Sequence, residues 1–110
     1  FGSGCAALSA IVHALCKTGD KIVCIDDVYG GTQRFLRKQV APVYGMNPVF
    51  VDFKDEAAVE KAVEGAKFVW LETPTNPNLE VTDIAKISAI TKKHNVMLVV
   101  DNTFLSPYLQ

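Results

Sequence analysis

Short apolar runs alternate with amphipathic stretches along the chain. Runs typical of strands cover residues 21–25, 49–53, 68–71 and 96–100. Helical patterns cover residues 6–15, 31–44, 56–64 and 83–94, with Asp55 as a cap for the third and Pro42 expected to end the second early. Because strands alternate with helices, we predict an α/β fold, a three-layer sandwich with a mainly parallel sheet and right-handed crossovers.

The composition is that of a globular domain or of part of one. The chain has 110 residues, of which 49% are hydrophobic, so it has enough apolar side chains to bury a core. It begins at Phe1 instead of Met and ends at Gln110 without a helical pattern that would cap the fold. We therefore interpret residues 1–110 as an internal fragment of one larger domain.

Charge and hydropathy exclude two classes of partner. Eleven Lys and Arg against twelve Asp and Glu give a net charge of -1, and no stretch concentrates basic residues as a nucleic-acid surface requires. No apolar run approaches the length of a membrane span, and the first residues do not resemble a signal peptide. We expect a cytoplasmic protein that binds neither nucleic acid nor membrane.

The cysteines and histidines do not predict a metal site. Cys5, Cys16 and Cys24 are odd in number, lie among apolar residues and lack the close paired spacing of zinc or redox motifs. We interpret them as free, buried thiols. His13 and His94 have no Cys, Asp or Glu at ligand spacing, so we expect them to be structural or on the surface.

Polar residues follow two of the predicted strands at the points where those strands end. Residues 72–77 follow the strand at 68–71, and Asp101, Asn102 and Thr103 follow the strand at 96–100. Ligands of open α/β sheets bind beyond the carboxyl ends of parallel strands, so Asn76 and Asp101 should share one site for a small-molecule cofactor. The alternative for Asn76, which lies between two prolines, is an ordinary turn.

The chemistry of these two side chains indicates a ring as the ligand. The amide of Asn76 offers a donor and an acceptor, which suits a phenolic oxygen on a ring. Asp101 ends an apolar strand, and its carboxylate needs a partner that offsets the cost of desolvation. A protonated heterocyclic nitrogen would be such a partner.

Two further segments fit the same ligand. Gly2, Ser3 and Gly4 form a turn before the first helix, whose N-terminus offers free N–H groups to a phosphate. Tyr29 follows the strand at 21–25, and the Gly30–Gly31 pair would turn the chain sharply, leaving the tyrosine ring free to stack on a flat ligand. The alternatives are a plain turn at Gly2–Gly4 and a surface tyrosine.

Taken together, these segments resemble the Cys/Met-metabolism family of pyridoxal-phosphate-dependent enzymes. The resemblance runs through the whole chain and rests on Ser3-Gly4-Cys5-Ala6-Ala7, Asp27-Val28-Tyr29-Gly30-Gly31-Thr32, Glu72-Thr73-Pro74-Thr75-Asn76-Pro77 and Val100-Asp101-Asn102-Thr103-Phe104. It implies that residues 1–110 are part of the large, cofactor-binding domain of the aspartate-aminotransferase fold. It also implies a homotetramer.

The resemblance implies a role for each matched residue. The N–H groups of Gly4 and Cys5, next to Ser3, would bind the phosphate of pyridoxal phosphate, and Tyr29 would stack on its ring as a catalytic residue. Asn76 would bond the ring hydroxyl oxygen, Asp101 would keep the ring nitrogen protonated, and Thr103 would support Asp101. No metal site is implied.

Two departures from the family pattern are visible. Cys5 stands where many relatives have Leu or Met, which a contact through the backbone should tolerate. The lysine that bonds to the cofactor in the family, expected in a Ser-x-x-Lys motif, is absent, and Lys86, Lys92 and Lys93 have the pattern of a solvated helix face. We therefore expect the fragment alone to be inactive and the complete protein to be the enzyme.

Within the family, residues 26–34 look most like the branch that cleaves cystathionine by γ-elimination into cysteine, 2-oxobutyrate and ammonia. Cystathionine γ-synthases, methionine γ-lyases and cystathionine β-lyases share the same motifs, so these alternatives stay open. From other classes, a nucleotide-binding α/β domain would use Asp101 to hold Mg²⁺, and a non-catalytic scaffold would keep only the fold.

Overall fold

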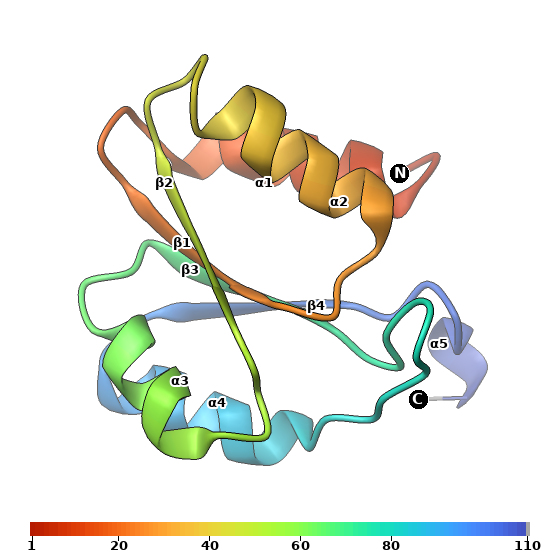
Figure 1. The fold of residues 1–110 in the computed structure, drawn as a ribbon. Helices are drawn as coiled ribbons and strands as arrows, with labels where there is room; N and C mark the ends of the chain where they lie inside the picture. Colours follow the sequence, from red (N-terminus) through yellow and green to blue (C-terminus); the bar gives the residue numbers. More distant parts are fainter. Residues whose placement is uncertain (110) are drawn as a thin grey trace.

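The computed structural model describes residues 1–109 and contains one parallel sheet with strand order β2-β1-β3-β4. Its elements are α1 (Gly4–Leu15), β1 (Lys21–Ile25), α2 (Gly30–Phe35), the π-helical segment η1 (Leu36–Val40), β2 (Asn47–Val51), α3 (Glu56–Val63), β3 (Phe68–Glu72), α4 (Ile84–Lys93), β4 (Met97–Asp101) and α5 (Ser106–Leu109). Helices α1 and α2 cover one face of the sheet, and α3 and α4 cover the other (Figure 1). The predicted three-layer α/β sandwich is confirmed.

The two central strands form the core of the sheet. Every residue of β3 is buried, as are all residues of β1 after Lys21, because helices pack on both faces. Phe68 and Trp70 are among the largest fully buried side chains. Continuous apolar runs such as 68–71 are typical of parallel strands covered on both sides, which explains why the sequence pattern located these strands well.

The bounds of the outer strand β2 differ from the predicted ones. β2 spans Asn47–Val51 instead of 49–53, because its register with β1 pairs Lys21 with Asn47 and Ile25 with Val51. Phe53 attracted the prediction by being apolar, but it lies in the core after the strand has ended. Pro48 is tolerated because β2 is at the edge of the sheet, where a missing N–H costs little.

Most predicted helices lie close to their observed bounds. Asp55 caps α3 by accepting a hydrogen bond from the Ala58 N–H at 3.0 Å. Asp83, predicted inside a helix, instead caps α4 by accepting from Ala85 N–H at 2.9 Å. Short polar side chains favour this cap position because they satisfy N–H groups that the first helical turn leaves free.

Two stretches of helix differ from the predicted helices. The long helix expected at 31–44 ends at Val40 and changes from α-helix to π-helix at Leu36. This agrees with the expected effect of Pro42, which lies just beyond its end. The short helix α5 near the chain end was not predicted, and with four residues it is too short to show a helical period.

The cysteines are free, but only Cys24 is fully buried, so the prediction of three buried thiols is partly wrong. Burial, and then the negative charges of Glu72 and Asp26, raise the pKa of the Cys24 thiol well above its ordinary value. Such a thiol is inert as a nucleophile near neutral pH. Cys5 and Cys16 are half-buried.

The histidines and the lysines have structural or surface contacts. His13 packs edge-on against Tyr44, with ring centres 5.2 Å apart. His94 lies 3.5 Å from Glu60. Lys86 pairs with Glu56 at 3.1 Å and Lys93 with Glu60 at 2.6 Å, both on the exposed surface, as expected for a solvated helix face.

Residues 1–109 show neither of two features, a metal-binding cluster or a membrane-spanning helix. They contain no cluster of three or more His, Cys, Asp and Glu side chains placed to hold a metal ion. None of the helices in this part of the chain has the length and apolar character needed to cross a membrane.

Candidate functional site

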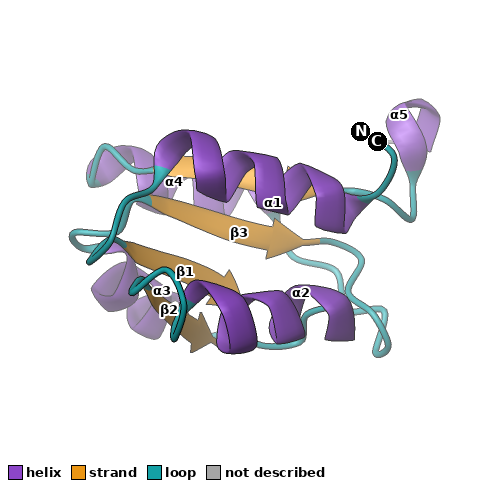
Figure 2. Cartoon of the chain, turned by 90° about the horizontal axis from the view of Figure 1, so that it is seen from above, coloured by secondary structure: helices purple, strands orange, loops and turns teal. Residues whose placement is uncertain are grey.

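A pocket of about 510 Å³ lies at the edge of the sheet where the parallel strands end. In Figure 2 the strands run in the same direction toward the edge at which the N-terminus of α1 also lies. Every predicted site residue lines this pocket, namely Ser3, Gly4, Cys5, Tyr29, Asn76, Asp101 and Thr103. The volume falls in the range of small-molecule and cofactor sites, roughly 300–1,000 Å³.

The start of α1 forms one wall of the pocket. Ser3 is the N-cap, and its hydroxyl oxygen accepts a hydrogen bond from the Ala6 N–H at 3.1 Å. The Ala7 N–H donates to the Ser3 carbonyl at 3.0 Å. Helical geometry provides no carbonyl acceptor for the N–H groups of Gly4 and Cys5, which therefore remain available to an anion at the positive end of the helix dipole.

Gly4 is needed for a reason that the sequence did not reveal. A Cβ atom at this position would lie only 2.4 Å from Asp101 Oδ2 and 3.3 Å from Thr103 Oγ1. Any side chain here would push the carboxylate away. The glycine thus brings the helix N-terminus and the end of β4 together.

Asp101 is the last residue of β4, and Thr103 holds its side chain. Asp101 Oδ1 accepts hydrogen bonds from the Thr103 N–H at 3.0 Å and from the Thr103 hydroxyl. The other oxygen, Oδ2, lies beside Gly4 in the pocket. Thr103 therefore supports Asp101 through a direct contact and fixes where the carboxylate points.

Asp101 is less buried than its place at the end of an apolar run predicts. β4 and Asp101 itself are only half-buried among the described residues, because β4 lies at the edge of their sheet. The fully buried strand is β3, and its last residue is Glu72. A carboxylate at the end of a buried strand needs partners. This need is therefore stronger for Glu72 than for Asp101.

Tyr29 lies at the opposite wall of the pocket with nearly half of its surface exposed. It is the N-cap residue of α2. A Cβ atom at Gly31 would lie 2.6 Å from Tyr29 Cε1 and 3.0 Å from Cys5 Sγ. Gly31 therefore gives the ring room. The sharp turn predicted for the glycine pair is wrong, since both glycines belong to α2 and neither has a positive φ.

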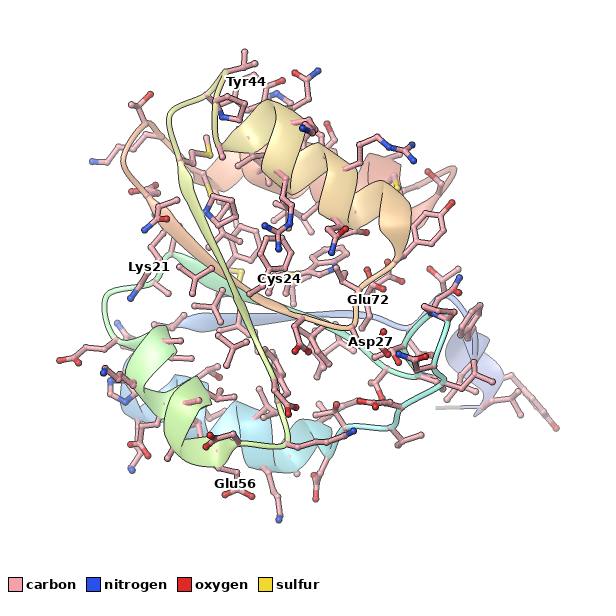
Figure 3. The ribbon with its side chains drawn as sticks, in the orientation of Figure 1. Lys21, Cys24, Asp27, Tyr44, Glu56 and Glu72 are labelled. Carbon is pink, nitrogen blue, oxygen red and sulfur yellow. The ribbon has the colours of Figure 1, made fainter. Side chains whose placement is uncertain are left out.

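Asn76 belongs to the loop after β3, and a neighbour anchors that loop. The Thr75 hydroxyl donates to Asp27 Oδ2 at 2.5 Å, and the Asn78 amide donates to Asp27 Oδ1 at 2.9 Å. Asp27 lies in the segment between β1 and α2, so it ties the Asn76 loop to the Tyr29 segment. Figure 3 shows Asp27 and Glu72 at the same end of the sheet, opposite Lys21.

Sequence reasoning assigned no role to Glu72, although it lines the pocket. Its side chain accepts hydrogen bonds from the Tyr29 N–H, the Thr32 hydroxyl and the Trp70 indole N–H. The signal that could have found it is its place after an apolar run, the same signal that singled out Asp101. Thr32, Pro74 and Phe104 also line the pocket without having been predicted.

Comparison with known proteins adds an independent observation. The model of the Cys/Met metabolism PLP-dependent enzyme family matches residues 1–110. The chain belongs to this family. The enzymes of this family depend on pyridoxal phosphate, which is the cofactor expected from the motifs.

Two curated relatives with the name cystathionine gamma-lyase match the whole chain. Human cystathionine gamma-lyase is 51% identical over 112 residues, covering 100% of this chain and 27% of its own length. The cystathionine gamma-lyase of Bacillus subtilis (strain 168) is 46% identical over 111 residues, covering 100% of this chain and 29% of its own length. The chain thus spans less than a third of the length of these relatives.

Solved structures of the family share the fold. Cystathionine gamma-lyase from Lactobacillus plantarum matches with a TM-score of 0.90 and 44% identity, covering 98% of this chain and 28% of that one. O-acetylhomoserine sulfhydrylase from Wolinella succinogenes matches with a TM-score of 0.89 and 39% identity, covering 97% and 30%. Because structures with different named activities fit almost equally well, the fold agrees with the family and leaves the reaction open.

Proposed function

We propose that residues 1–110 form part of the cofactor-binding large domain of a trans-sulfuration enzyme, and that the pocket holds pyridoxal phosphate. The carrying observation is the position of Asp101. Thr103 orients its carboxylate, which lies against Gly4 at the N-terminus of α1. An anion site and a carboxylate thus lie side by side in one pocket, as a phosphate and a protonated ring nitrogen on one ligand require.

The remaining residues fit the other parts of the cofactor. The N–H groups of Gly4 and Cys5, after the Ser3 cap, would bind the phosphate. The exposed ring of Tyr29 would stack on the pyridine ring and take part in catalysis, and the Asn76 amide would bond the ring hydroxyl oxygen. These assignments use groups that line one pocket and whose loops are held by Glu72 and Asp27.

Asp101 has the central chemical role in this proposal. Its carboxylate would keep a proton on the ring nitrogen by pairing with the positive charge. Bound pyridoxal phosphate supplies an electron sink that stabilises negative charge at the substrate α-carbon. Thr103 contributes by donating two hydrogen bonds to Oδ1, which hold the carboxylate in place.

The structure gives a reason to prefer this site over a magnesium site. Glu72 and Asp101 are register partners on β3 and β4, so a second acid does stand beside Asp101. Both oxygens of Glu72 already accept hydrogen bonds from protein donors, and they point toward Tyr29 and Thr32. This arrangement favours a structural carboxylate over a metal ligand.

For the complete protein we infer the γ-lyase reaction, in which cystathionine and water yield cysteine, 2-oxobutyrate and ammonia. The names of relatives at about half identity support this choice. Cystathionine γ-synthase, methionine γ-lyase and cystathionine β-lyase activities are the alternatives. A homotetramer, expected from the resemblance, and a cytoplasmic location stay predictions.

The reaction is tested by supplying cystathionine to the full-length enzyme and identifying the keto acid. We expect 2-oxobutyrate together with cysteine. Pyruvate with homocysteine would show β-elimination, and consumption of an activated homoserine ester with cysteine would show a synthase. Either result would replace the proposed reaction while leaving the cofactor assignments of Tyr29, Asn76 and Asp101 intact.

A further inference from the structure

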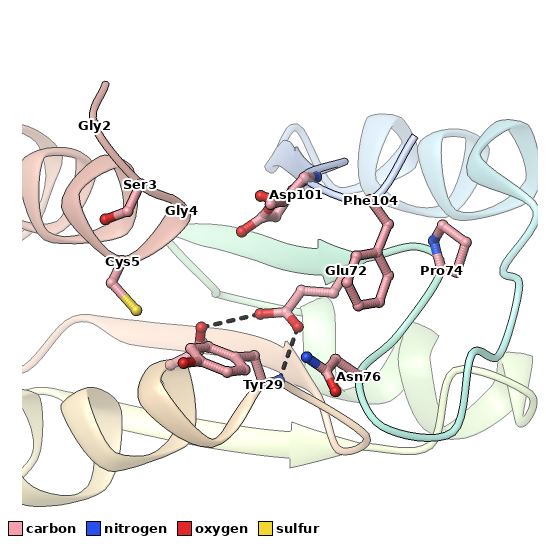
Figure 4. A pocket seen from close by; sticks show the side chains of 12 residues that line it. Gly2, Ser3, Gly4, Cys5, Tyr29, Glu72, Pro74, Asn76, Asp101 and Phe104 are labelled. Atoms are coloured by element: carbon pink, nitrogen blue, oxygen red, sulfur yellow. Dashed lines mark hydrogen bonds between the residues drawn. The ribbon is translucent and has the colours of Figure 1, made fainter. Parts of the chain in front are cut away.

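Glu72 is a buried carboxylate whose contacts lead to the stacking residue. Its side chain is 5% exposed, and it reaches from the end of β3 toward the start of α2. Figure 4 shows the carboxylate between Asp101 and Tyr29, with dashed hydrogen bonds on the Tyr29 side. A buried carboxylate is costly unless hydrogen bonds compensate for its lost hydration, so the hydrogen-bond donors around Glu72 determine whether it is stable there.

The donors come from two parts of the fold, the start of α2 and the strand β3. Glu72 Oε2 accepts from the Tyr29 backbone N–H at 2.8 Å. Oε1 accepts from the Thr32 hydroxyl at 3.0 Å and from the Trp70 indole N–H at 3.1 Å. The salt bridges within residues 1–109 do not include Glu72, so these neutral donors are its known compensation.

Only a side chain with a hydrogen-bond acceptor at both terminal atoms can accept from the Tyr29 N–H, the Thr32 hydroxyl and the Trp70 indole together. An ionised carboxylate has two acceptor oxygens, whereas an amide has one oxygen and one NH₂ donor. In a glutamine at position 72 the NH₂ group would face either the Tyr29 N–H or the Trp70 indole N–H. Both of these are donors that cannot accept a hydrogen bond. The isosteric amide would therefore break one contact while keeping the volume.

We propose that Glu72 is a positioning residue for the Tyr29 ring. Its bond to the Tyr29 N–H fixes the backbone from which the ring projects, and its bond to Thr32 fixes the first turn of α2. Gly31 then gives the ring space between that turn and Cys5. Glu72 thus acts on a stacked cofactor through its contacts with the Tyr29 segment. This inference rests on the proposed function, because it requires a cofactor over Tyr29.

The test is a double-mutant cycle in the full-length protein, with the apparent Kd for pyridoxal phosphate and the near-UV dichroism of the bound cofactor as readouts. Glu72→Gln should weaken binding about tenfold, the usual effect of one unsatisfied buried donor. In a Tyr29→Ala background the same change should weaken binding less than about twofold, because the ring is gone and coupled residues are not additive. The exposed Glu64→Gln is the control and should change neither readout.

Equal losses in both backgrounds, or no loss in the protein that keeps Tyr29, would overturn the positioning role. If Glu72→Gln does not accumulate as folded protein, Glu72→Asp replaces it. Aspartate keeps the charge and both acceptors but draws them back from the Tyr29 N–H, so the same dependence on Tyr29 is expected. Failure of the unmodified protein to bind pyridoxal phosphate would instead overturn the proposed function. Asp101→Asn tests that function separately, because it changes the proposed partner of the ring nitrogen and leaves Glu72 and Tyr29 unchanged.

Discussion

Replacing Asp101 by alanine in the full-length protein should lower turnover by about 10²–10³-fold, the usual loss when one preorganised electrostatic group is removed from an active site. The reason is specific. In the proposed site the ring nitrogen would lose its proton without the carboxylate, and a neutral pyridine is a much poorer electron sink. Cofactor retention should weaken as well, because an ion pair in the pocket is lost. Steady-state kinetics and the cofactor content after dialysis measure the two effects.

Asp83→Ala is the matched control for this change. Asp83 also accepts backbone hydrogen bonds, but it caps α4 and does not line the pocket. Its loss should cost about 1 kcal/mol of unfolding free energy and leave turnover per bound cofactor unchanged. If Asp101→Ala kept turnover within a few-fold of the unmodified protein, the ring-nitrogen role would have to be dropped.

Tyr29→Ala should weaken cofactor binding by roughly 10- to 100-fold, which corresponds to the ~1–3 kcal/mol that stacking of a flat heterocycle on an aromatic ring provides. Tyr29→Phe keeps the stacking surface and should lose less than about threefold, because the ring contact dominates. Titration of the cofactor-free protein by absorbance gives both values. The backbone N–H that bonds Glu72 remains in both variants, so each difference belongs to the side chain.

The comparison of the two tyrosine variants carries the prediction. Nearly half of the ring is exposed, so removing it should cost little stability, and unfolding midpoints of the two variants should differ little. If Phe and Ala weakened binding equally, the hydroxyl group would be the important part of Tyr29 and the stacking role would be wrong.

The sequence predicted the layers and the site because both have strong local signals. The buried runs of β1 and β3 define the sheet centre, and polar residues at strand ends identify Asn76 and Asp101. The glycine turn before α1 predicted the wall of the pocket that the start of this helix forms. In parallel sheets these positions converge by topology, so the pocket could be assembled without knowing any distance.

What the sequence could not predict depends on contacts between distant residues. The register of β2 follows from pairing with β1, and the hydrophobic Phe53 obscured it. Gly4 and Gly31 owe their identity to neighbours, Asp101 and Tyr29, that only folding brings near. Glu72 and Asp27 act through partners more than forty positions away, at Tyr29 and Thr75.

The most direct test of the central claim is a crystal structure of the full-length protein with pyridoxal phosphate bound. We expect the phosphate at the N–H groups of Gly4 and Cys5, the ring against Tyr29, and the ring nitrogen within hydrogen-bond distance of Asp101. We also expect the lysine bonded to the cofactor to lie outside residues 1–110. A cofactor bound away from this pocket, or a ring nitrogen that faces a group other than Asp101, would contradict the account.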